Sequence, residues 1–260
     1  MTATKLTTEG LAARQPSRTA INLVIAAFFL LGFFVGRTRQ LPAQNLVDAF
    51  SHPKDVVDAY HQWYYDHFET TWRNTTWLGT EAEKYPPDMW VYQEIMYETK
   101  PDVLIEAGTF KGGSALYFAS IFDLMKHGRV VTIDITQYPN LPQHPRITYL
   151  LGSSTAPEIF QQLKSAIHPG DKVMVSLDSD HHKAHVLKEL QLYSQLVTLG
   201  NYLVVEDCEI NGHPVLSSFG PGPAEAVAEF LSTNRDFVQD HSREKFGLTA
   251  SPGGWLKRVR

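Results

Sequence analysis

A short segment, residues 102–114 (DVLIEAGTFKGGS), places the strongest constraint on how this chain can fold. Its apolar residues 103–105 predict a buried strand, and Glu106 follows directly. A glycine-rich turn comes next, and a helix is expected to begin at or near Ser114. Glycine permits positive φ angles and lets the backbone approach a ligand closely. A strand, a glycine turn and a helix start in this order therefore predict a nucleotide-recognition element.

The spacing of the turn residues separates the candidate ligands. A phosphate-binding P-loop needs Gly-Lys-Ser/Thr at the helix start, whereas Lys111 here precedes Gly112 and Gly113. A dinucleotide fingerprint needs glycine where this chain has Phe110. The remaining pattern, Glu-x-Gly-x-x-x-Gly-Gly-Ser, favours S-adenosylmethionine (SAM), which has no phosphate to bring against the backbone. The alternative is that these glycines only form a tight strand–helix connection.

Candidate SAM contacts follow from this turn and from the strand ends beside it. Glu106 could meet the cationic methionine end of SAM. Asp134 ends the next apolar run, residues 129–134, where an acid can accept hydrogen bonds from the ribose hydroxyls. The predicted cofactor-binding set is Glu106, Gly108, Gly113, Ser114, Asp134, Ser153 and Asp178.

Apolar strands alternate with helical segments from residue 102 to the end of the chain. Strands are expected at 102–106, 129–134, 146–151, 172–178 and 201–206, helices at 113–126, 156–166, 183–198 and 223–232, and an antiparallel hairpin at 235–240 and 254–259. This alternation predicts an α/β fold with a doubly wound, mainly parallel sheet. Ligands bind such a sheet at the carboxyl ends of its strands.

Acidic side chains gather at two of these predicted strand ends. Asp178 ends one strand, and Glu206 and Asp207 end the next. Carboxylates at the same edge of a sheet repel one another unless a cation neutralises them, and hard oxygen ligands suit Mg²⁺, Mn²⁺ or Ca²⁺. We therefore expect these three residues to be metal ligands. The alternative is ordinary cap and turn chemistry, with Asp180 capping the following helix.

His181 lies one step into the loop above the predicted metal site. Histidine can transfer protons near neutral pH, and we expect His181 to be the general base. A metal-ligand role and a solvated cap are the alternatives, and His182 and Lys183 are further candidates for the base.

The N-terminal part has a different composition. Residues 1–18 are polar and predict a disordered tail, whereas residues 19–36 carry no charge and are long enough to span a bilayer as a helix. A cleaved signal peptide and a buried helix are the alternatives. Residues 37–100 predict a helical extension, and residues 101–260 the catalytic domain. We expect a membrane-anchored protein whose catalytic domain lies in the cytoplasm, where SAM is made.

Charge and cysteine usage exclude some classes of protein. The net charge of −5 argues against a nucleic-acid surface, and the single cysteine, Cys208, excludes an intramolecular disulfide framework. The sequence leaves a homo-oligomer open.

Four motifs carry a family resemblance: EAGTFKGGS, LDSDHH, VVEDCEINGHPVLSSFGPGPAEAVAEFL and EKFGLTASPGGWLKRV. Together they resemble the cephalosporin hydroxylase/rhamnosyl O-methyltransferase-type family of class I SAM-dependent methyltransferases, over roughly residues 70–260. The resemblance implies a Rossmann-like fold, SAM at the glycine turn and Asp134, and Mg²⁺ at Asp178, Glu206 and Asp207. The arrangement is similar to catechol O-methyltransferase, except that His181 falls where a catalytic lysine sits and Cys208 where an amide ligand sits.

These observations predict a SAM-dependent, Mg²⁺-assisted O-methyltransferase. Its acceptor would be a hydroxyl of a small molecule, a sugar or a glycolipid, in lipid or natural-product biosynthesis. A metal-dependent hydroxylase, oxygenase or hydrolase built on Asp180, His181 and His182 is one alternative. An inactive, membrane-tethered SAM-binding protein is another.

Overall fold

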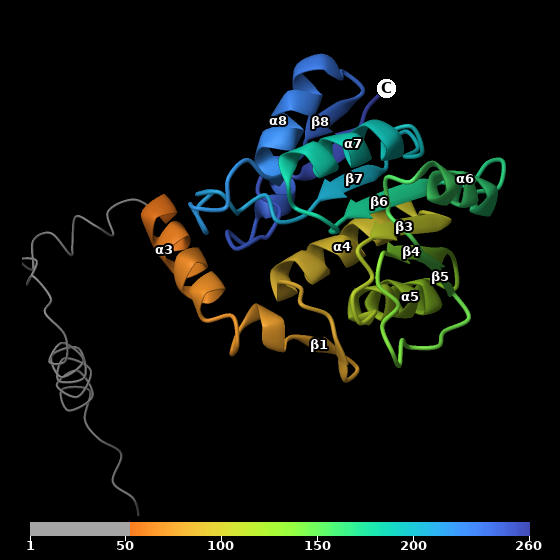
Figure 1. Cartoon of the computed structure of the whole chain (residues 1–260), viewed down its shortest axis with the longest axis horizontal. Helices are drawn as coiled ribbons and strands as arrows, with labels where there is room; N and C mark the ends of the chain where they lie inside the picture. The colour runs from red at the N-terminus through yellow and green to blue at the C-terminus, as the bar shows by residue number, and fades with distance from the viewer. Residues whose placement is uncertain (1–52) are drawn as a thin grey trace, which may run out of the picture. The chain divides into compact units, whose positions relative to one another are not determined.

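The computed structural model describes residues 53–260 (Figure 1). The expected tail (1–18) and membrane anchor (19–36), and the first part of the expected helical extension, lie outside the described residues. Among the helices from residue 53 onward, none has the length and hydrophobicity that crossing a membrane requires.

The segment that precedes the main sheet is not wholly helical. In order it contains α3 (Pro53–Asp66), the 3-10 turn η1 (Trp72–Asn74), β1 (Thr76–Trp77), β2 (Thr80–Glu81) and α4 (Pro86–Thr99). The strands β1 and β2 pair as a hairpin through Leu78 and Gly79, whose φ angles are 48° and 84°. Two positive φ angles define a tight hairpin turn that leucine rarely adopts, so the sequence did not indicate it. The expected helical extension therefore contains α3 and α4 and, between them, a short β-hairpin.

Strands and helices then alternate as predicted. The elements are β3 (Val103–Ala107), α5 (Gly113–Met125), β4 (Arg129–Asp134), β5 (Ile147–Leu151), α6 (Pro157–Ala166), β6 (Val173–Leu177), α7 (Lys183–Tyr193), β7 (Tyr202–Val205), α8 (Pro223–Thr233), β8 (Phe237–Gln239), the 3-10 turn η2 (His241–Glu244) and β9 (Trp255–Arg258). The expected C-terminal antiparallel hairpin is confirmed as the β8–β9 pair.

The seven-stranded sheet has the order β5-β4-β3-β6-β7-β9-β8. Its first five strands are parallel, and β9 joins β7 in the antiparallel direction. The chain builds outward from β3 to β4 and β5, then returns to place β6 on the other side of β3. The strand order therefore reverses between β3 and β6, which is where such sheets leave a crevice for a ligand.

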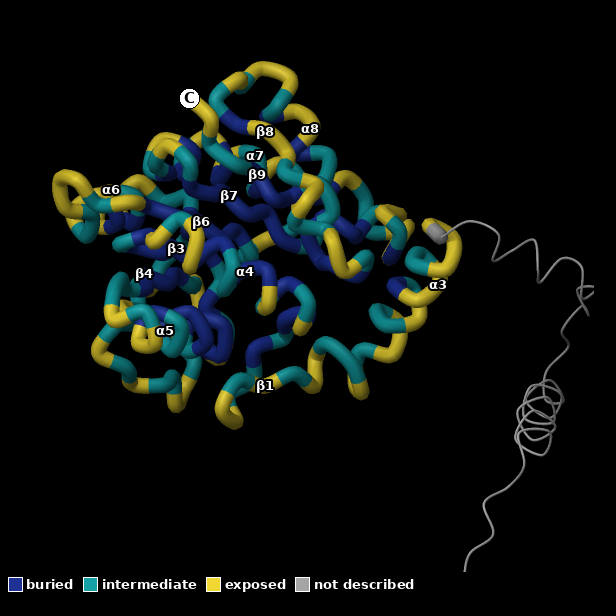
Figure 2. Tube along the Cα trace, turned by 180° about the vertical axis from the view of Figure 1, so that it is seen from behind, coloured by how far each residue is buried: buried dark blue, intermediate teal, exposed yellow. Residues whose placement is uncertain are grey.

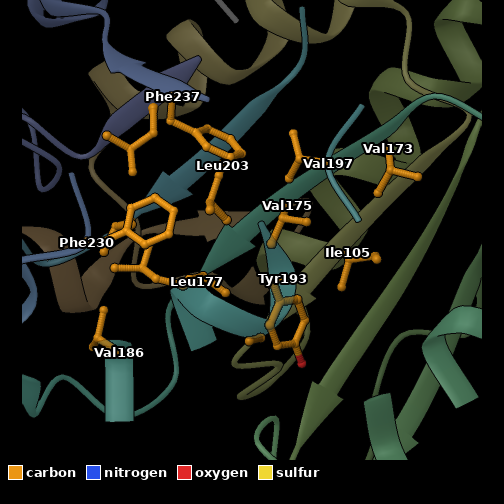
Figure 3. Close-up of a cluster of buried hydrophobic side chains, with 14 of the residues drawn as sticks. Ile105, Val173, Val175, Leu177, Val186, Tyr193, Val197, Leu203, Phe230 and Phe237 are labelled. Carbon is orange, nitrogen blue, oxygen red and sulfur yellow. The ribbon is translucent and has the colours of Figure 1, made fainter. Parts of the chain in front are cut away.

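Side chains of β3 alternate between two apolar cores. Ile105 belongs to a cluster with Tyr193 of α7 and Phe230 of α8 (Figure 3). Its neighbour Leu104 points to the opposite face and joins a cluster with residues of α4 and α5, including Phe118. Burying one such apolar side chain fully stabilises the fold by about 1.5–3 kcal/mol. The central strands β3, β6 and β7 are therefore buried between two helical layers (Figure 2), and their carboxyl ends are held in a fixed arrangement.

Candidate active site

The loop after β3 meets the end of β6 so closely that only glycine fits at position 108. Gly108 has a φ of 104°, and a Cβ built there would lie 1.9 Å from the carbonyl oxygen of Asp178. The Asp178 peptide N–H in turn donates to the carbonyl of Ala107 at 2.8 Å. Gly108 therefore does more than permit a turn, because the absence of a side chain lets the loop after β3 lie against the end of β6 at Asp178.

The two glycines before α5 have different roles from Gly108. Gly112 precedes the helix with a φ of 79°. A Cβ on Gly113 would lie 2.2 Å from the carbonyl oxygen of Glu81, so Gly113 makes room for the β2 backbone. The structure thus gives Gly113 a packing role, whereas Ser114 lines the cavity described below.

Asp134 holds two loops at the end of β4. Its Oδ2 accepts a hydrogen bond from the Phe110 N–H and its Oδ1 accepts one from the Thr136 N–H, both at 2.8 Å. These bonds fix the carboxylate at the mouth of the β3 turn. Each oxygen keeps a lone pair, so the carboxylate can still accept a hydrogen bond from a ligand hydroxyl.

Glu106 lies beneath the turn and is fully buried. Its Oε2 accepts a hydrogen bond from the Thr132 hydroxyl at 2.6 Å, and its Oε1 has no partner among the described residues. Burial raises the pKa of Glu106 to about 7, although the nearby Lys84 ammonium opposes the shift. Glu106 does not line the cavity, so the structure places it under the predicted cofactor site and not on its surface.

One cavity of about 720 Å³ opens at the carboxyl edge of the sheet. Most of the residues that the sequence singled out line it. They are Gly108, Ser114, Asp134, Ser153, Asp178, His181, Glu206 and Asp207. Segments from β3, β4, β5, β6 and β7 therefore converge on a single hollow.

Three side chains near the switch point could hold a cation together. The ligand atoms of Asp178, His181 and Asp207 lie within 4.8 Å of one another. His181 Nε2 is 2.9 Å from Asp207 Oδ2. Burial lowers the pKa of His181, but the charge and hydrogen bond of Asp207 outweigh it and raise the pKa to about 9. His181 is therefore protonated at neutral pH as long as it is paired with Asp207.

Glu206 is occupied differently from the expectation that it ligates a metal. Its Oε1 accepts hydrogen bonds from the hydroxyls of Tyr92 (2.7 Å) and Ser176 (2.8 Å). Its Oε2 pairs with Lys84 Nζ at 2.7 Å, and the same ammonium pairs with Asp178. Glu206 thus stands outside the group of three ligand atoms, and Lys84 takes the place of a cation between the two strand ends.

The sequence did not indicate Lys84, which is buried at 4% exposure. The charges of Asp178 and Glu206 raise the pKa of Lys84 despite its burial, so it remains charged. When all are ionised, the three carboxylates at residues 178, 206 and 207, the Lys84 ammonium and the protonated His181 leave a net charge of about −1. Burial, opposed by Lys84 and assisted by Glu206 and Asp207, raises the pKa of Asp178 to about 8. The site therefore holds an excess of negative charge that a divalent cation would offset.

His182 and Lys183, the other candidates for the general base, are paired with residues outside the group of three ligand atoms. His182 is 72% exposed and its Nδ1 lies 2.6 Å from Asp180, which also accepts the His182 peptide N–H. Lys183 pairs with Glu229 of α8. The described residues therefore do not gather Asp180, His181 and His182 into the metal centre that the oxygenase alternative requires.

The end of the cavity farther along the loop after β7 is aromatic and polar. Tyr65 and Trp72 stack with ring centroids 5.6 Å apart, and both line the cavity. Tyr85 and Glu209 line it as well. Burial, followed by the nearby charge of Asp207, raises the pKa of Glu209 well above its usual range. The loop that follows β7 supplies Glu209 to this end of the cavity.

The doubly wound sheet, the glycine turn and the strand-end carboxylates around one cavity define the class I methyltransferase fold. Residues 69–259 match the family model described as Rhamnosyl O-methyltransferase/CmcI. The chain therefore belongs to the rhamnosyl O-methyltransferase/CmcI family, and the enzyme class predicted from the sequence, a SAM-dependent O-methyltransferase, is confirmed.

Similar proteins come from mycobacteria. A rhamnosyl O-methyltransferase of Mycobacterium tuberculosis (strain ATCC 25618 / H37Rv) is 42% identical over 238 residues, which cover 88% of this chain and 96% of the relative. A rhamnosyl O-methyltransferase of Mycobacterium leprae (strain TN) is 42% identical over 212 residues, covering 78% and 90%.

Solved structures support the fold. An apo structure of CmcI has a TM-score of 0.56 at 20% identity, covering 87% of this chain and 88% of CmcI. A CmcI structure described as Mg-SAM has a TM-score of 0.55 at 20% identity, covering 86% and 98%. At this identity the likeness establishes the Rossmann-like methyltransferase fold.

Proposed function

We propose that this protein transfers the methyl group of SAM to a hydroxyl of a sugar, with the assistance of Mg²⁺. The observation that carries the proposal is the convergence of the glycine-turn segment and the carboxylates Asp178 and Asp207 on one cavity. A methyl donor and a metal-bound hydroxyl must lie side by side for the transfer, and positioning of this kind supplies much of the rate.

SAM would occupy the half of the cavity formed by the β3, β4 and β5 ends. Ser114, Asp134 and Ser153 line that half. Asp134 is held by two backbone N–H groups and keeps lone pairs for ribose hydroxyls. Glu106 lies below this half of the site, and its Oε1 has no partner among the described residues. The cationic part of SAM would favour the ionised form of this buried carboxyl, whose pKa is raised to about 7.

The donor set fits Mg²⁺, which prefers carboxylate oxygens. Asp178 and Asp207 would hold it, and Glu206 would join them where Lys84 gives up its bond to Glu206 Oε2. When bound, SAM supplies an electrophilic methyl group and Mg²⁺ lowers the pKa of a bound hydroxyl.

His181 is the proposed general base. Its Nε2 lies 2.9 Å from Asp207, whose charge keeps the ring protonated. A cation held by Asp178 and Asp207 would offset their negative charge and so lower the pKa of His181 toward its ordinary value. The neutral ring can then accept a proton from the acceptor hydroxyl.

The acceptor is proposed to be a sugar, because the relatives that are 42% identical are rhamnosyl O-methyltransferases. The uncharged residues 19–36 support a membrane anchor. Residues 101–260 would then be a catalytic domain on the cytoplasmic side, where SAM is made, and an anchored enzyme suits a glycolipid acceptor.

A direct test offers the purified full-length chain SAM with a labelled methyl group, Mg²⁺ and either rhamnosyl glycolipids or sugar-free lipids. Labelled product from the rhamnosyl lipids alone is the expected result. Binding of SAM without transfer to any sugar would contradict the sugar acceptor. Failure to bind SAM in calorimetry would contradict the site itself.

A further inference from the structure

We propose that Tyr85 and Glu209 form a hydroxyl-binding pair that holds a pyranose ring by two hydroxyls other than the one that is methylated. This inference rests on the proposed function, since it describes the acceptor end of the same cavity. Tyr85 comes directly before α4, and Glu209 follows Asp207 by two residues beyond β7. Neither residue was singled out by its own sequence pattern.

Both side chains are deeply buried, yet each has an atom without a partner. Glu209 is 1% exposed and Tyr85 is 4% exposed. Glu209 Oε2 and the Tyr85 hydroxyl have no hydrogen-bond partner among the described residues. Several other buried atoms in residues 53–260 share this property, but Tyr85 and Glu209 are the two such residues that line the cavity.

An unpartnered buried polar group is costly, because it has lost its bond to water without gaining another. Phenylalanine at position 85 would fit the aromatic neighbours Tyr64 and His61, whose ring centroids lie 4.9 and 5.6 Å from that of Tyr85. The hydroxyl is therefore not explained by packing. A ligand in the cavity that offers hydroxyl groups would satisfy both residues at once.

The surroundings indicate the class of ligand. Tyr65 and Trp72 present aromatic rings to the same cavity, and Leu216 and Phe219 add apolar surface. A sugar ring has an apolar C–H face and polar edges, so it suits aromatic walls with hydroxyl-binding groups between them. Asp207 is two residues before Glu209 in the sequence, and both line the cavity. One hydroxyl of the sugar ring can therefore lie at Asp178 and Asp207 while other hydroxyls reach Tyr85 and Glu209.

The test uses methyl α-L-rhamnopyranoside, which has three free hydroxyls, and its three monodeoxy analogues. For wild type we expect kcat/KM for methyl transfer to fall by about 100-fold or more when a recognised hydroxyl is removed, because the site is then left unpaired. In Tyr85→Phe and Glu209→Gln the parent glycoside loses about 10- to 100-fold, and each variant no longer discriminates against one deoxy analogue. Tyr97→Phe, on the exposed surface of α4, is the control.

Two further readouts separate the outcomes. SAM affinity by calorimetry and the Tm report whether each variant is folded, and neither should fall, because the pair lies outside the SAM half. Variants that keep both the wild-type KM and the wild-type discrimination would overturn the pair while leaving the methyltransferase intact. If wild type neither methylates nor binds any rhamnoside in NMR saturation-transfer experiments, the sugar acceptor itself is wrong, and the inference fails with it.

Discussion

Lys84 Nζ lies 2.7 Å from Glu206 Oε2, and both side chains are 4% exposed. This ion pair joins the segment before α4 to the end of β7, across the edge where the catalytic groups meet. Breaking a buried pair by removing one partner leaves an uncompensated charge and costs about 3–5 kcal/mol. The contact therefore fixes both the fold and the charge of the site.

Lys84→Met should lower the free energy of unfolding by about 3–5 kcal/mol in the absence of divalent ions. Added Mg²⁺ should raise the Tm of this variant more than that of wild type, because the carboxylates then lack their internal cation. Lys111→Met is the matched control, since the Lys111 pair with Glu81 is exposed and should be worth less than about 1 kcal/mol. Equal losses in the two variants would show that the buried pair is not a structural element.

Gly108→Ala should abolish detectable SAM binding, because the added Cβ would lie 1.9 Å from the Asp178 carbonyl and force the two loops apart. Calorimetric titration of SAM measures this directly. Gly170→Ala is the control, because Gly170 also has a positive φ but nothing lies within 4 Å of the added Cβ. Wild-type affinity in Gly108→Ala would mean that the loop contact is dispensable.

Tyr85→Phe should increase the free energy of unfolding by up to about 1–2 kcal/mol, since it removes a buried hydroxyl that has no partner within residues 53–260. Urea unfolding monitored by tryptophan fluorescence checks the sign. A less stable variant would indicate that the hydroxyl is already satisfied in the free protein.

Asp240→Asn should destabilise the protein at neutral pH but not in acid. Despite burial, hydrogen bonds from Ser242 and Tyr202 and the charge of Arg243 lower the pKa of Asp240 from 3.8 to about 2. A lowered pKa adds stability that is complete above about pH 4 and is lost as the pH falls to about 2. Because solvent screens this partly exposed carboxylate, we expect a contribution of about 1–2 kcal/mol. Unfolding curves for both proteins should therefore converge near pH 2, and a constant gap would contradict this assignment.

The parts of the fold that are local in sequence could be predicted. Residues 103–105 form a strand and Ser114 lies in the first turn of α5, because apolar runs and glycine turns act over a few residues. The proximity of Asp178 and Asp207 could also be predicted, since parallel strands place their carboxyl ends at one edge of the sheet. The gathering of these residues around one cavity is thus largely a consequence of topology.

The contacts that decide what each carboxylate does could not be predicted. Glu206 is held by Lys84, Tyr92 and Ser176, which stand 122, 114 and 30 residues away along the chain. No periodicity links such positions, and only tertiary packing brings them together. For the same reason the sequence indicated no individual role for Glu209 or Tyr85.

The central claim is that Asp178 and Asp207 hold a divalent cation that methyl transfer requires. The most direct measurement follows labelled methyl transfer from SAM to a rhamnosyl acceptor in Mg²⁺, after chelation, and after Mg²⁺ is restored, with SAM binding measured in parallel. We predict that chelation abolishes transfer, that Mg²⁺ restores it, and that Asp207→Asn shows little transfer in either condition while still binding SAM. Transfer at the wild-type rate in the presence of chelator would contradict the account.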